Sequence, residues 1–500
     1  MYYTPTELIN RNIKVGAIES NSEALKKLIE DDRTSAYKVA MQDGHNYFLV
    51  ENTNIMNTEM NKFSSYQNYG TEDKPSWGEV QKTNPQSANI KKPSETFRNS
   101  ILQKIDYGLS NGVMIEHPDE LTQENILEVL GKESDATISE HAQVGSVSAL
   151  GYIHCYINKD GSFGYTVMNP KELIVIYSDD TRKLIESVIR YYTITSIQDG
   201  ENESKLRIEV YSATDKKVYD EAENNVMVYN TDLYSAYGLI RETDTDIGVP
   251  VNWGKPPFIE YINNPERITD LQAAKLKIDD LDYQDSRLSN DFTDKPESLI
   301  VLKEYDGTSS YDAMDRFKVA GVAAVSGDGG IDSVKLEIPY EGKQSVMKET
   351  KKDIYSALQS VDTSAETVSK APSGIALQML YRPLEMKVQR MYQGLTKSLY
   401  DLMYFINKYF EMSSSLQGNT YKTFDVDDVT FTYTPNRVLN LVELADVAVK
   451  FASIGLPTEE WLKLLPFIDQ NNIEDVVKQI EKEREDIFNE PIEDHPEIDE

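Results

Sequence analysis

The chain has 500 residues and a formal charge of −33, from 84 Asp and Glu against 51 Lys and Arg. This length corresponds to about three average domains, enough to bury several cores without disulfides or a metal. The acidic balance excludes a protein that grips a duplex through a basic face, because such binding releases counterions through clustered cations. With 39% hydrophobic residues and 31 Tyr, the chain is predicted to be mainly globular.

The single cysteine and the absence of long apolar runs indicate the compartment. Cys155 excludes an intrachain disulfide and favours a buried, unreactive thiol. The first residues lack the charged and apolar regions of a signal peptide, and no apolar run approaches the ~18 residues of a membrane span. We therefore expect a soluble cytoplasmic protein with no membrane partner.

The first hundred residues alternate between helical and polar segments. Residues 1–40 read as short helical pieces with a small apolar stripe over 24–29, which predicts an N-terminal arm. Residues 71–93 are rich in Lys, Asn, Ser, Gln and Pro, a composition typical of a surface loop or insert. Apolar residues at spacings of four then predict a helix over 97–109.

Residues 146–229 change to the alternating pattern of strands. The turn around Gly161 predicts a β-hairpin between 152–156 and 164–168. Further strand-like runs over 172–177, 187–194, 206–211 and 225–229 indicate a strand-rich domain.

Two helices separated by a small β module follow Pro256 and Pro257. One apolar stripe from Ile268 to Phe292 predicts a helix about 40 Å long. Strand-like runs over 299–302 and 319–325, and a Gly-rich turn over 326–330, predict the module. A second helix is expected over 343–359.

A polar segment over 362–372 leads into a long helix over 373–410. Ser373 is a candidate N-cap, and Pro383 should bend the helix because it removes an amide donor. Alternation at Val429, Phe431 and Tyr433 predicts one returning strand. Residues 439–490 are expected to be mainly helical, with an acidic, frayed end.

The search for catalytic motifs is largely negative. The five histidines lack the spacing of a zinc site, and 327–330 lacks the lysine that ends a phosphate-binding loop. Four aspartates on the first long helix would, on one interpretation, hold a divalent cation: Asp279, Asp280, Asp282 and Asp285. They point to several faces of a helix, so a solvated charged face is the favoured interpretation.

The order of elements and several short motifs resemble the phage portal protein family of long-tailed phages of Gram-positive bacteria. The motifs lie at 172–177, 190–192, 257–258, 263–264, 270–271, 278–279, 326–330, 337–339 and 372–377. The resemblance covers about four-fifths of the chain. It implies an α+β portal fold with a strand-rich wing, a two-helix stem, a small α/β clip, a long kinked helix and a helical crown.

The resemblance also implies the limits of each part. These are an N-terminal arm at 1–40, wing at 41–265, stem helix one at 266–293, clip at 294–342, stem helix two at 343–361, tunnel loop at 362–372, long kinked helix at 373–410, wing return strand at 411–435, crown at 436–490 and acidic tail at 491–500. The insert at 71–93 has no counterpart that we can place.

The implied function is a non-enzymatic ring of about a dozen subunits at one capsid vertex, without cofactor or metal, through which double-stranded DNA is packaged and ejected. Implied partners are the terminase, a head-completion (adaptor) protein, the major capsid protein and the scaffolding protein. The ring would also help initiate procapsid assembly, in the host cytoplasm, and remain in the virion.

The DNA channel is expected at the tunnel loop and the helix before it. The candidate loop residues are Asp362, Thr363, Ser364, Glu366, Thr367, Ser369 and Lys370, and the candidate channel bases are Lys343, Lys348, Lys351 and Lys352. A solvated helix face is an equal alternative for these lysines. The rival function is a metal-dependent carboxylate hydrolase or nuclease that uses Asp279, Asp282 and Asp285.

Overall fold

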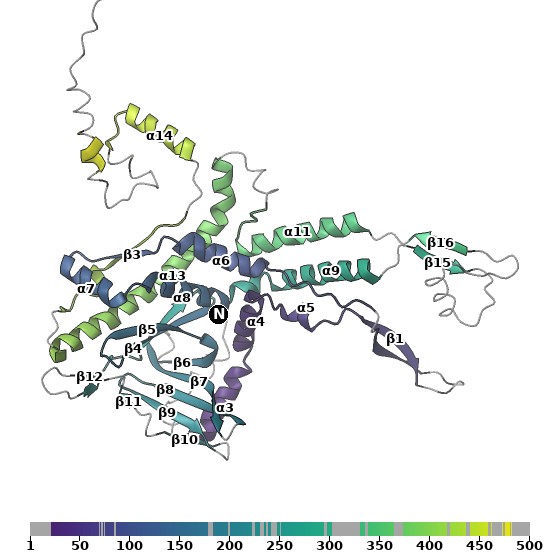
Figure 1. Ribbon diagram of the computed structural model, residues 1–500, viewed down its shortest axis with the longest axis horizontal. Coiled ribbons are helices and arrows are strands. Elements are labelled where there is room, and N and C mark those ends of the chain that lie inside the picture. The colour runs from purple at the N-terminus through teal and green to yellow at the C-terminus, as the bar shows by residue number, and fades with distance from the viewer. Residues whose placement is uncertain are drawn as a thin grey trace, which may run out of the picture. The chain divides into compact units, whose positions relative to one another are not determined.

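The computed structural model combines helices with antiparallel sheets, the α+β class predicted from the sequence (Figure 1). It describes residues 22–69, 71, 74, 76–84, 87–178, 184–198, 201–222, 226–230, 235–236, 239–241, 248–250, 252–294, 298–302, 331–335, 339–364, 374–417, 421–436, 441–458, 462, 473, 476–480 and 482. The chain divides into two compact units, with unit 1 comprising Met1–Asp362 and Pro383–Pro435 and unit 2 comprising Thr363–Arg382 and Asn436–Glu500.

The elements alternate along the chain. The described helices are α3 (Ser22–Arg33), α4 (Ala36–Phe48), α5 (Thr53–Asn57), α6 (Thr96–Leu109), α7 (Glu120–Leu130), α8 (Ser134–Ser148), η1 (Pro170–Glu172), η3 (Asp270–Ala273), α9 (Lys275–Asp294), α11 (Tyr340–Leu358), α13 (Gly374–Gln417), η4 (Val426–Asp428) and α14 (Leu441–Ser453). The described strands are β1 (Lys62–Asn68), β2 (Trp77–Thr83), β3 (Val113–Glu116), β4 (Leu150–Ile157), β5 (Phe163–Met168), β6 (Leu173–Tyr177), β7 (Ile185–Gln198), β8 (Glu201–Tyr211), β9 (Asp215–Glu221), β10 (Met227–Tyr229), β11 (Ser235–Ala236), β12 (Leu239–Arg241), β13 (Gly248–Pro250), β14 (Phe258–Ile262), β15 (Ser298–Leu302), β16 (Ile331–Lys335) and β17 (Thr430–Tyr433).

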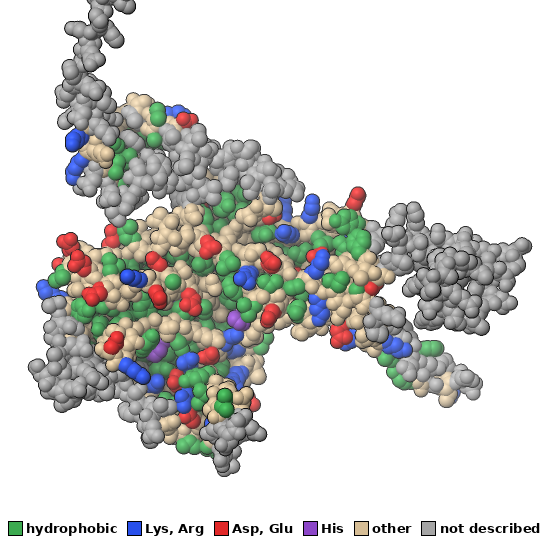
Figure 2. All heavy atoms as spheres, in the orientation of Figure 1, with side chains coloured by type: hydrophobic (Ala, Val, Ile, Leu, Met, Phe, Trp, Pro, Cys, Tyr) green, Lys and Arg blue, Asp and Glu red, His purple; other side chains and the backbone are tan. Residues whose placement is uncertain are grey.

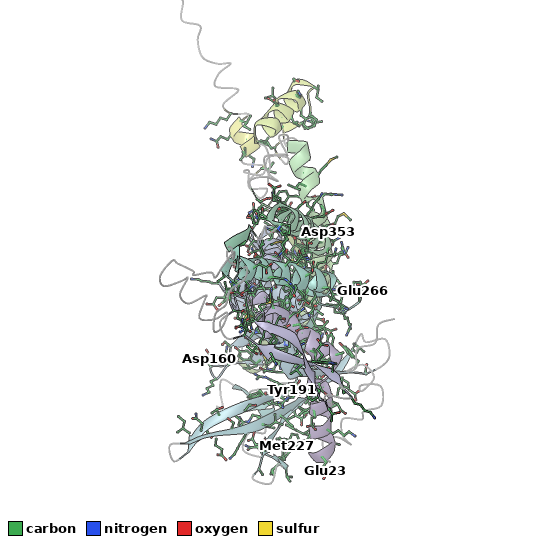
Figure 3. The ribbon with its side chains drawn as sticks, turned by 90° about the vertical axis from the view of Figure 1, so that its right-hand side faces the viewer. Glu23, Asp160, Tyr191, Met227, Glu266 and Asp353 are labelled. Atoms are coloured by element: carbon green, nitrogen blue, oxygen red, sulfur yellow. The ribbon has the colours of Figure 1, made fainter. Side chains whose placement is uncertain are left out.

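The largest sheet has the order β10-β9-β8-β7-β6, with β11 paired to β9. Its apolar face is covered by α3, whose Leu25, Leu28 and Ile29 are buried in one cluster with strand residues that include Tyr191 and Met227 (Figure 3). The apolar stripe predicted here is confirmed. From Ser22 onward the segment expected to be an arm is packed against a sheet, because that stripe needs an apolar partner.

A second sheet, β14-β4-β5, contains the predicted hairpin. Gly161 in its turn has a φ of 86°, a left-handed conformation that glycine adopts without a steric cost. Gly145 on α8 allows β14 to approach closely, since a Cβ there would lie 2.2 Å from the ring of Tyr261. Cys155 is buried in this sheet, as predicted, and burial raises the pKa of its thiol well above the ordinary value.

The long helix α13 carries the apolar stripe that the sequence predicts, and the helix extends beyond the predicted end to Gln417. The members of the stripe in unit 1 are all at most 2% exposed: Leu384, Val388, Met391, Leu395, Leu399, Leu402, Ile406 and Phe410. Tyr392 donates to the carbonyl of Gly108 over 2.7 Å. Pro383 lies inside the helix, at the division between the two units, and a bend there stays a prediction. The candidate N-cap Ser373 lies outside the described residues.

The predicted stem is an antiparallel pair, α9 and α11, joined through the β15–β16 hairpin (Figure 1). The first helix begins later than predicted, after a turn in which the side chain of Asn264 bonds both backbone groups of Ile268, at 3.0 and 2.7 Å. Such local bonds compete with helix formation. The strand expected at 319–325 and the turn at 326–330 lie outside the described residues.

The polar segment expected to be a loop over 71–93 contains a strand. Here β2 pairs with β1 in an antiparallel hairpin from Lys62↔Thr83 to Asn68↔Trp77. The predicted returning strand is confirmed as β17, which pairs with β3. In unit 2, α14 is described, and Leu462 and Ile473 are buried, whereas the acidic end lies outside the described residues.

Candidate functional site: the stem and the root of the tunnel loop

The helix α11, the second helix of the predicted stem, ends at a defined stop. Gln359 adopts the left-handed conformation, with a φ of 52°, and its N–H bonds the carbonyls of Ser356 and Tyr355. The Nζ of Lys387 on α13 donates to the carbonyl of Leu358 over 2.8 Å. A cation at a helix C-terminus satisfies an unpaired carbonyl and favours the helix dipole. The last turn of α11 is therefore fixed from outside.

The residues that lead into the loop are held by α6. The amide of Gln103 makes a two-bond clamp on Val361, accepting from its N–H at 2.8 Å and donating to its carbonyl at 3.1 Å. The hydroxyls of Ser100 and Ser360 lie 2.8 Å apart. Arg390 on α13 donates to the side chain of Gln359 over 2.8 Å. We call this set of contacts the loop-root clamp.

A buried ionic cluster supports the clamp. The Asp270 carboxylate lies 2.9 Å from the Nζ of Lys387 and 3.2 Å from that of Lys104. Lys104, 2% exposed, also donates to Ser146 and Asn263 over 2.8 and 2.7 Å. Such burial is tolerated because each charge meets an opposite charge and hydrogen bonds.

The pKa values of this cluster follow from burial and pairing. Burial lowers the pKa of Lys104 to about 8, although Asp270 acts against that shift. Burial also opposes ionisation of Asp270, but the ammonium groups of Lys104 and Lys387 outweigh it and hold its pKa well below the usual range. Asp270 is therefore a carboxylate at neutral pH.

The helix α9 binds an extended segment, residues 87–95, which we call the strap. Four helix side chains at spacings of four accept from the N–H groups of alternate strap residues, in antiparallel order: Asp282 from Ser94 (2.8 Å), Ser286 from Lys92 (2.9 Å), Asn290 from Ile90 (2.8 Å) and Asp294 from Ala88 (2.7 Å). Four helix residues rise ~6 Å and two extended residues span ~6.6 Å, so the two repeats nearly match.

The aspartates of α9 do not converge on one point. Asp279 accepts from Tyr47, and Asp282 accepts from Asn52 and Ser94, whereas Asp280 contacts Gln284 and Asp285 contacts Lys92. Within the described residues no group of three or more His, Cys, Asp or Glu side chains could hold a metal ion. The predicted solvated face is wrong for Asp279 and Asp282, which are 7% and 1% exposed. The helix sequence alone could not predict this burial, because the partners of these two aspartates lie on other elements.

The predicted loop residues fall at the edge of the described chain. Asp362 is half-buried beside the loop-root clamp, and Thr363 and Ser364 are exposed. Glu366, Thr367, Ser369 and Lys370 lie outside the described residues. Their position in a channel stays a prediction.

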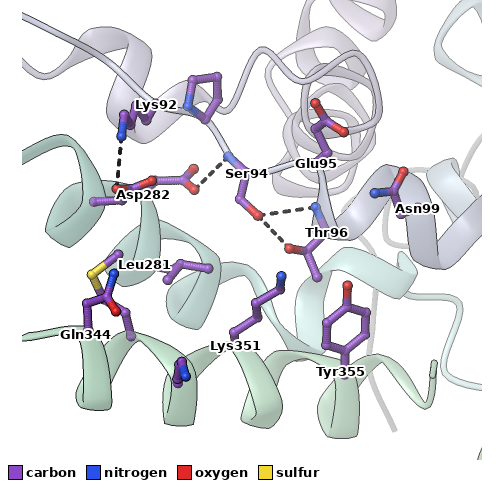
Figure 4. Close-up of a pocket in the computed structure, with 14 residues that line it drawn as sticks. Lys92, Ser94, Glu95, Thr96, Asn99, Leu281, Asp282, Gln344, Lys351 and Tyr355 are labelled. Atoms are coloured by element: carbon purple, nitrogen blue, oxygen red, sulfur yellow. Dashed lines mark hydrogen bonds and ion pairs between the residues drawn. The ribbon is translucent and has the colours of Figure 1, made fainter. Parts of the chain in front are cut away.

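The candidate channel bases separate into two kinds. Lys343 is half-buried and pairs with Asp291 of α9 over 2.8 Å, so its charge is balanced within the stem. Lys348, Lys351 and Lys352 are exposed on α11, where basic and acidic side chains alternate on the stem surface (Figure 2). Lys348 and Lys351 also line a groove of about 420 Å³ with Leu281 and Tyr355 (Figure 4).

Sequence reasoning missed the strap and the loop-root clamp. One pattern in the sequence could have indicated the strap. Polar residues recur at spacings of four along the helix that the apolar stripe predicts. Gln103, Lys387 and Arg390 carry no such signal, because their partners lie on other elements: backbone groups for Gln103 and Lys387, and the side chain of Gln359 for Arg390. In the part of the chain that the structure describes, no helix is long and apolar enough to cross a bilayer.

An antiparallel helix pair with a β module at its turn, leading into a clamped polar segment, is the arrangement expected of a portal stem. The profile of the family "Phage portal protein, SPP1 Gp6-like" matches residues 41–489. The chain therefore belongs to this family of phage portal proteins, the structural proteins of the head-to-tail junction.

Two relatives carry the same description. The chain is 27% identical over 358 residues to a protein named "Portal protein" of Bacillus phage SPP1, covering 72% of this chain and 69% of the relative. It is 27% identical over 384 residues to the "Portal protein" of Clostridium phage phiCD119, covering 73% of this chain and 79% of that relative. A solved structure titled "Neck of native GTA particle computed with C12 symmetry" is similar with a TM-score of 0.37 and 12% identity, covering 75% of this chain and 91% of that one.

Proposed function

We propose that copies of this chain form a ring of about a dozen subunits at one vertex of a phage capsid, and that double-stranded DNA passes through it during packaging and ejection. Membership of the portal family carries the proposal. The chain would be assembled in the host cytoplasm and remain in the virion.

The tunnel loop, residues 362–372, would line the channel. The observation that supports this role is the loop-root clamp, which fixes one end of the loop to the body of unit 1. A segment that touches moving DNA needs a rigid root and short polar side chains without a stacking platform. The exposed Lys348, Lys351 and Lys352 would supply weak phosphate contacts along the stem.

The clip, residues 294–342, would dock the terminase during packaging and the head-completion protein afterwards. The major capsid protein and the scaffolding protein would contact the ring during procapsid assembly. The support for these partners is the family alone.

Electron microscopy of the purified full chain tests the ring, and packaging in a phage that carries the variant gene tests the loop. We expect rings with an axial hole, and we expect Glu366→Ala and Lys370→Ala to assemble normally but to change the length or rate of packaged DNA. Stable monomers at micromolar concentration would contradict the ring. Normal packaging by both variants would contradict a role for these two side chains.

A further inference from the structure

The β1–β2 hairpin exposes two aromatic side chains that no described residue covers. Tyr69 and Trp77 are 66% and 64% exposed, and every residue of β2 is exposed or half-buried. Figure 2 shows hydrophobic side chains on the surface of this hairpin. Because a two-stranded hairpin alone is marginally stable in water, the two rings that the described residues leave exposed favour a partner.

The two rings lie on opposite faces of the hairpin. The N–H of Tyr69 bonds the carbonyl of Ser76 over 2.8 Å, so these two residues face each other across the strands. The Tyr69 ring lies against Gly78, where a Cβ would be 2.8 Å from it. Since side chains alternate along a strand, Trp77 points to the other face, where it is 64% exposed.

The strap fixes the root of the hairpin to the stem. Its even-numbered residues from 88 to 94 bind α9, as described, and two of its odd-numbered residues bind the segment before β1. Asn89 accepts from the N–H of Met60 over 2.9 Å, and Lys91 donates to the carbonyl of Met56. The root of the hairpin is therefore anchored to the stem, and an anchored root leaves less conformational entropy to be lost on binding.

The stem carries a groove of matching character. It lies between the strap, the start of α6 and the face of α11, and it measures about 420 Å³ (Figure 4). Leu281, Met347 and Tyr355 supply apolar surface, and Gln344 and Lys351 supply polar groups. A cleft with apolar walls and a few polar groups is the usual environment of a bound aromatic side chain.

We propose that the hairpin of one copy inserts Trp77 into this groove on the stem of the next copy. The inference rests on the proposed ring, which places a second stem beside each hairpin. It assigns a role to the 62–83 hairpin, whose second strand lies in the 71–93 segment for which the resemblance offered no counterpart.

Charge favours a second copy as the partner. Residues 59–84 carry three bases and four acids, 3 − 4 = −1, in a chain of charge −33. The residues that line the groove carry three bases and three acids, 3 − 3 = 0: Lys92, Lys348, Lys351, Glu95, Asp282 and Asp285. A nucleic acid would select an excess of bases, and a basic protein would select an acidic surface. Two copies of a strongly acidic chain repel each other except where both surfaces are close to neutral.

Cross-linking tests the proposal. In a Cys155→Ser background, Glu79→Cys on the Trp77 face and Gln344→Cys in the groove are combined, and assembled rings are treated with a short bis-maleimide. We expect a ladder of covalent multimers in denaturing gels. The matched control replaces Glu79→Cys by Lys159→Cys, an exposed turn position, and should give no ladder. Adding Trp77→Ala to the cross-linkable pair should reduce the ladder at least several-fold.

Fluorescence gives a second readout that does not require new cysteines. With Trp253→Phe and Trp461→Phe, Trp77 is the remaining indole, and its emission should shift to shorter wavelength when rings form. Rings that form normally, yet give no ladder and keep the emission of an exposed indole, would overturn the inference and leave the proposed function standing. A cross-link to capsid protein in particles, absent from purified rings, would overturn it in favour of another partner. Failure to form rings would overturn the proposed function, and this inference with it.

Discussion

Single buried charges decide whether the loop root is held in place. Asp270 is the one acidic group within salt-bridge distance of both Lys104 and Lys387 among the described residues, so removing its charge leaves the buried Lys104 and the half-buried Lys387 without an opposite charge. Breaking a buried pair in this way costs far more than breaking a surface pair.

We expect Asp270→Asn to lower the free energy of unfolding of unit 1 by about 3–5 kcal/mol. Chemical denaturation monitored by circular dichroism measures this loss. The control is Asp106→Asn, because Asp106 is exposed on α6 and should change stability by less than about 0.5 kcal/mol. Equal effects of the two substitutions would contradict a special role for Asp270.

Asp282 should make folding stability depend on pH with a sign opposite to that of an ordinary salt-bridged carboxylate. Burial raises its pKa to about 6, against the hydrogen bonds from Asn52 and Ser94 that favour the carboxylate. The folded state therefore binds more protons than the unfolded state between the ordinary aspartate pKa of 3.8 and about 6, and this contribution to stability falls as the pH rises through that window.

Comparing Tm of the natural chain and of Asp282→Asn across pH 4–7 measures this contribution. The stability difference between them should move in favour of the variant as the pH rises through the window. A difference that is independent of pH would show that Asp282 titrates near its ordinary value. Asp280→Asn, at an exposed position on the same helix, should show no comparable change.

At the scale of elements, the strap converts one face of α9 into a backbone-binding surface. Asn290 makes two of its bonds to one residue, accepting from the N–H of Ile90 and donating to its carbonyl over 2.8 and 2.9 Å. Because Asn290 is 6% exposed, truncating it leaves both backbone groups without their partner.

We expect Asn290→Ala to open the strap locally, at a cost of about 1–3 kcal/mol. Hydrogen exchange of the amides of 88–94 should become faster, while the amides of α13 keep their protection. Ser289→Ala, one residue away and outside the series that binds the strap, is the matched control. Unchanged exchange in the strap would mean that other contacts hold it.

The helices and several strands were predictable, because each is specified by a local period. The stripe of α13 and the alternation of β17 are examples, and both are confirmed. The start of α9 was missed, since Asn264 bonds Ile268 and the separate 3-10 turn η3 precedes the helix. The β1–β2 hairpin was missed because its polar composition resembles that of a loop. The loop-root clamp could not be predicted from local sequence patterns, since Gln103 and Val361 are 258 residues apart.

At the scale of the whole molecule, the charge of −33 opposes assembly. A ring of twelve copies would carry roughly −400, and its acidic surface would also discourage tight binding of DNA. Salt screens such repulsion, with a Debye length of about 10 Å at 0.1 M and about 3 Å at 1 M.

We therefore expect rings to become more stable as the salt concentration rises from about 0.05 to 0.5 M, in the range where screening is strongest. Mass photometry at nanomolar concentration would follow the fraction in rings. A ring that dissociates on adding salt would show that interfacial ion pairs outweigh the overall repulsion.

Substitutions at buried and at exposed positions of α9 distinguish effects on folding from effects on ring assembly. Leu281 belongs to the apolar stripe of α9, is 9% exposed and lines the groove together with residues of α11 in the same chain. Leu281→Asp should therefore damage the stem itself, because it buries an unpaired charge. Leu276, near the start of the same helix, is 81% exposed and offers its whole side chain to a partner.

Leu276→Asp should leave the monomer folded, with an unchanged Tm in a dissociated sample, and should reduce the fraction of rings at least tenfold. The reason is that a carboxylate at an apolar contact loses its hydration without gaining a partner, a cost of about 1–3 kcal/mol per interface that is repeated around the ring. Leu276→Ser is the matched variant, because it shortens the side chain without adding charge and should weaken assembly less. Light scattering gives the ring fraction, and circular dichroism confirms the fold. If Leu276→Asp assembled as well as the natural chain, this part of the stem would face solvent in the ring, and the contacts between copies would have to lie elsewhere.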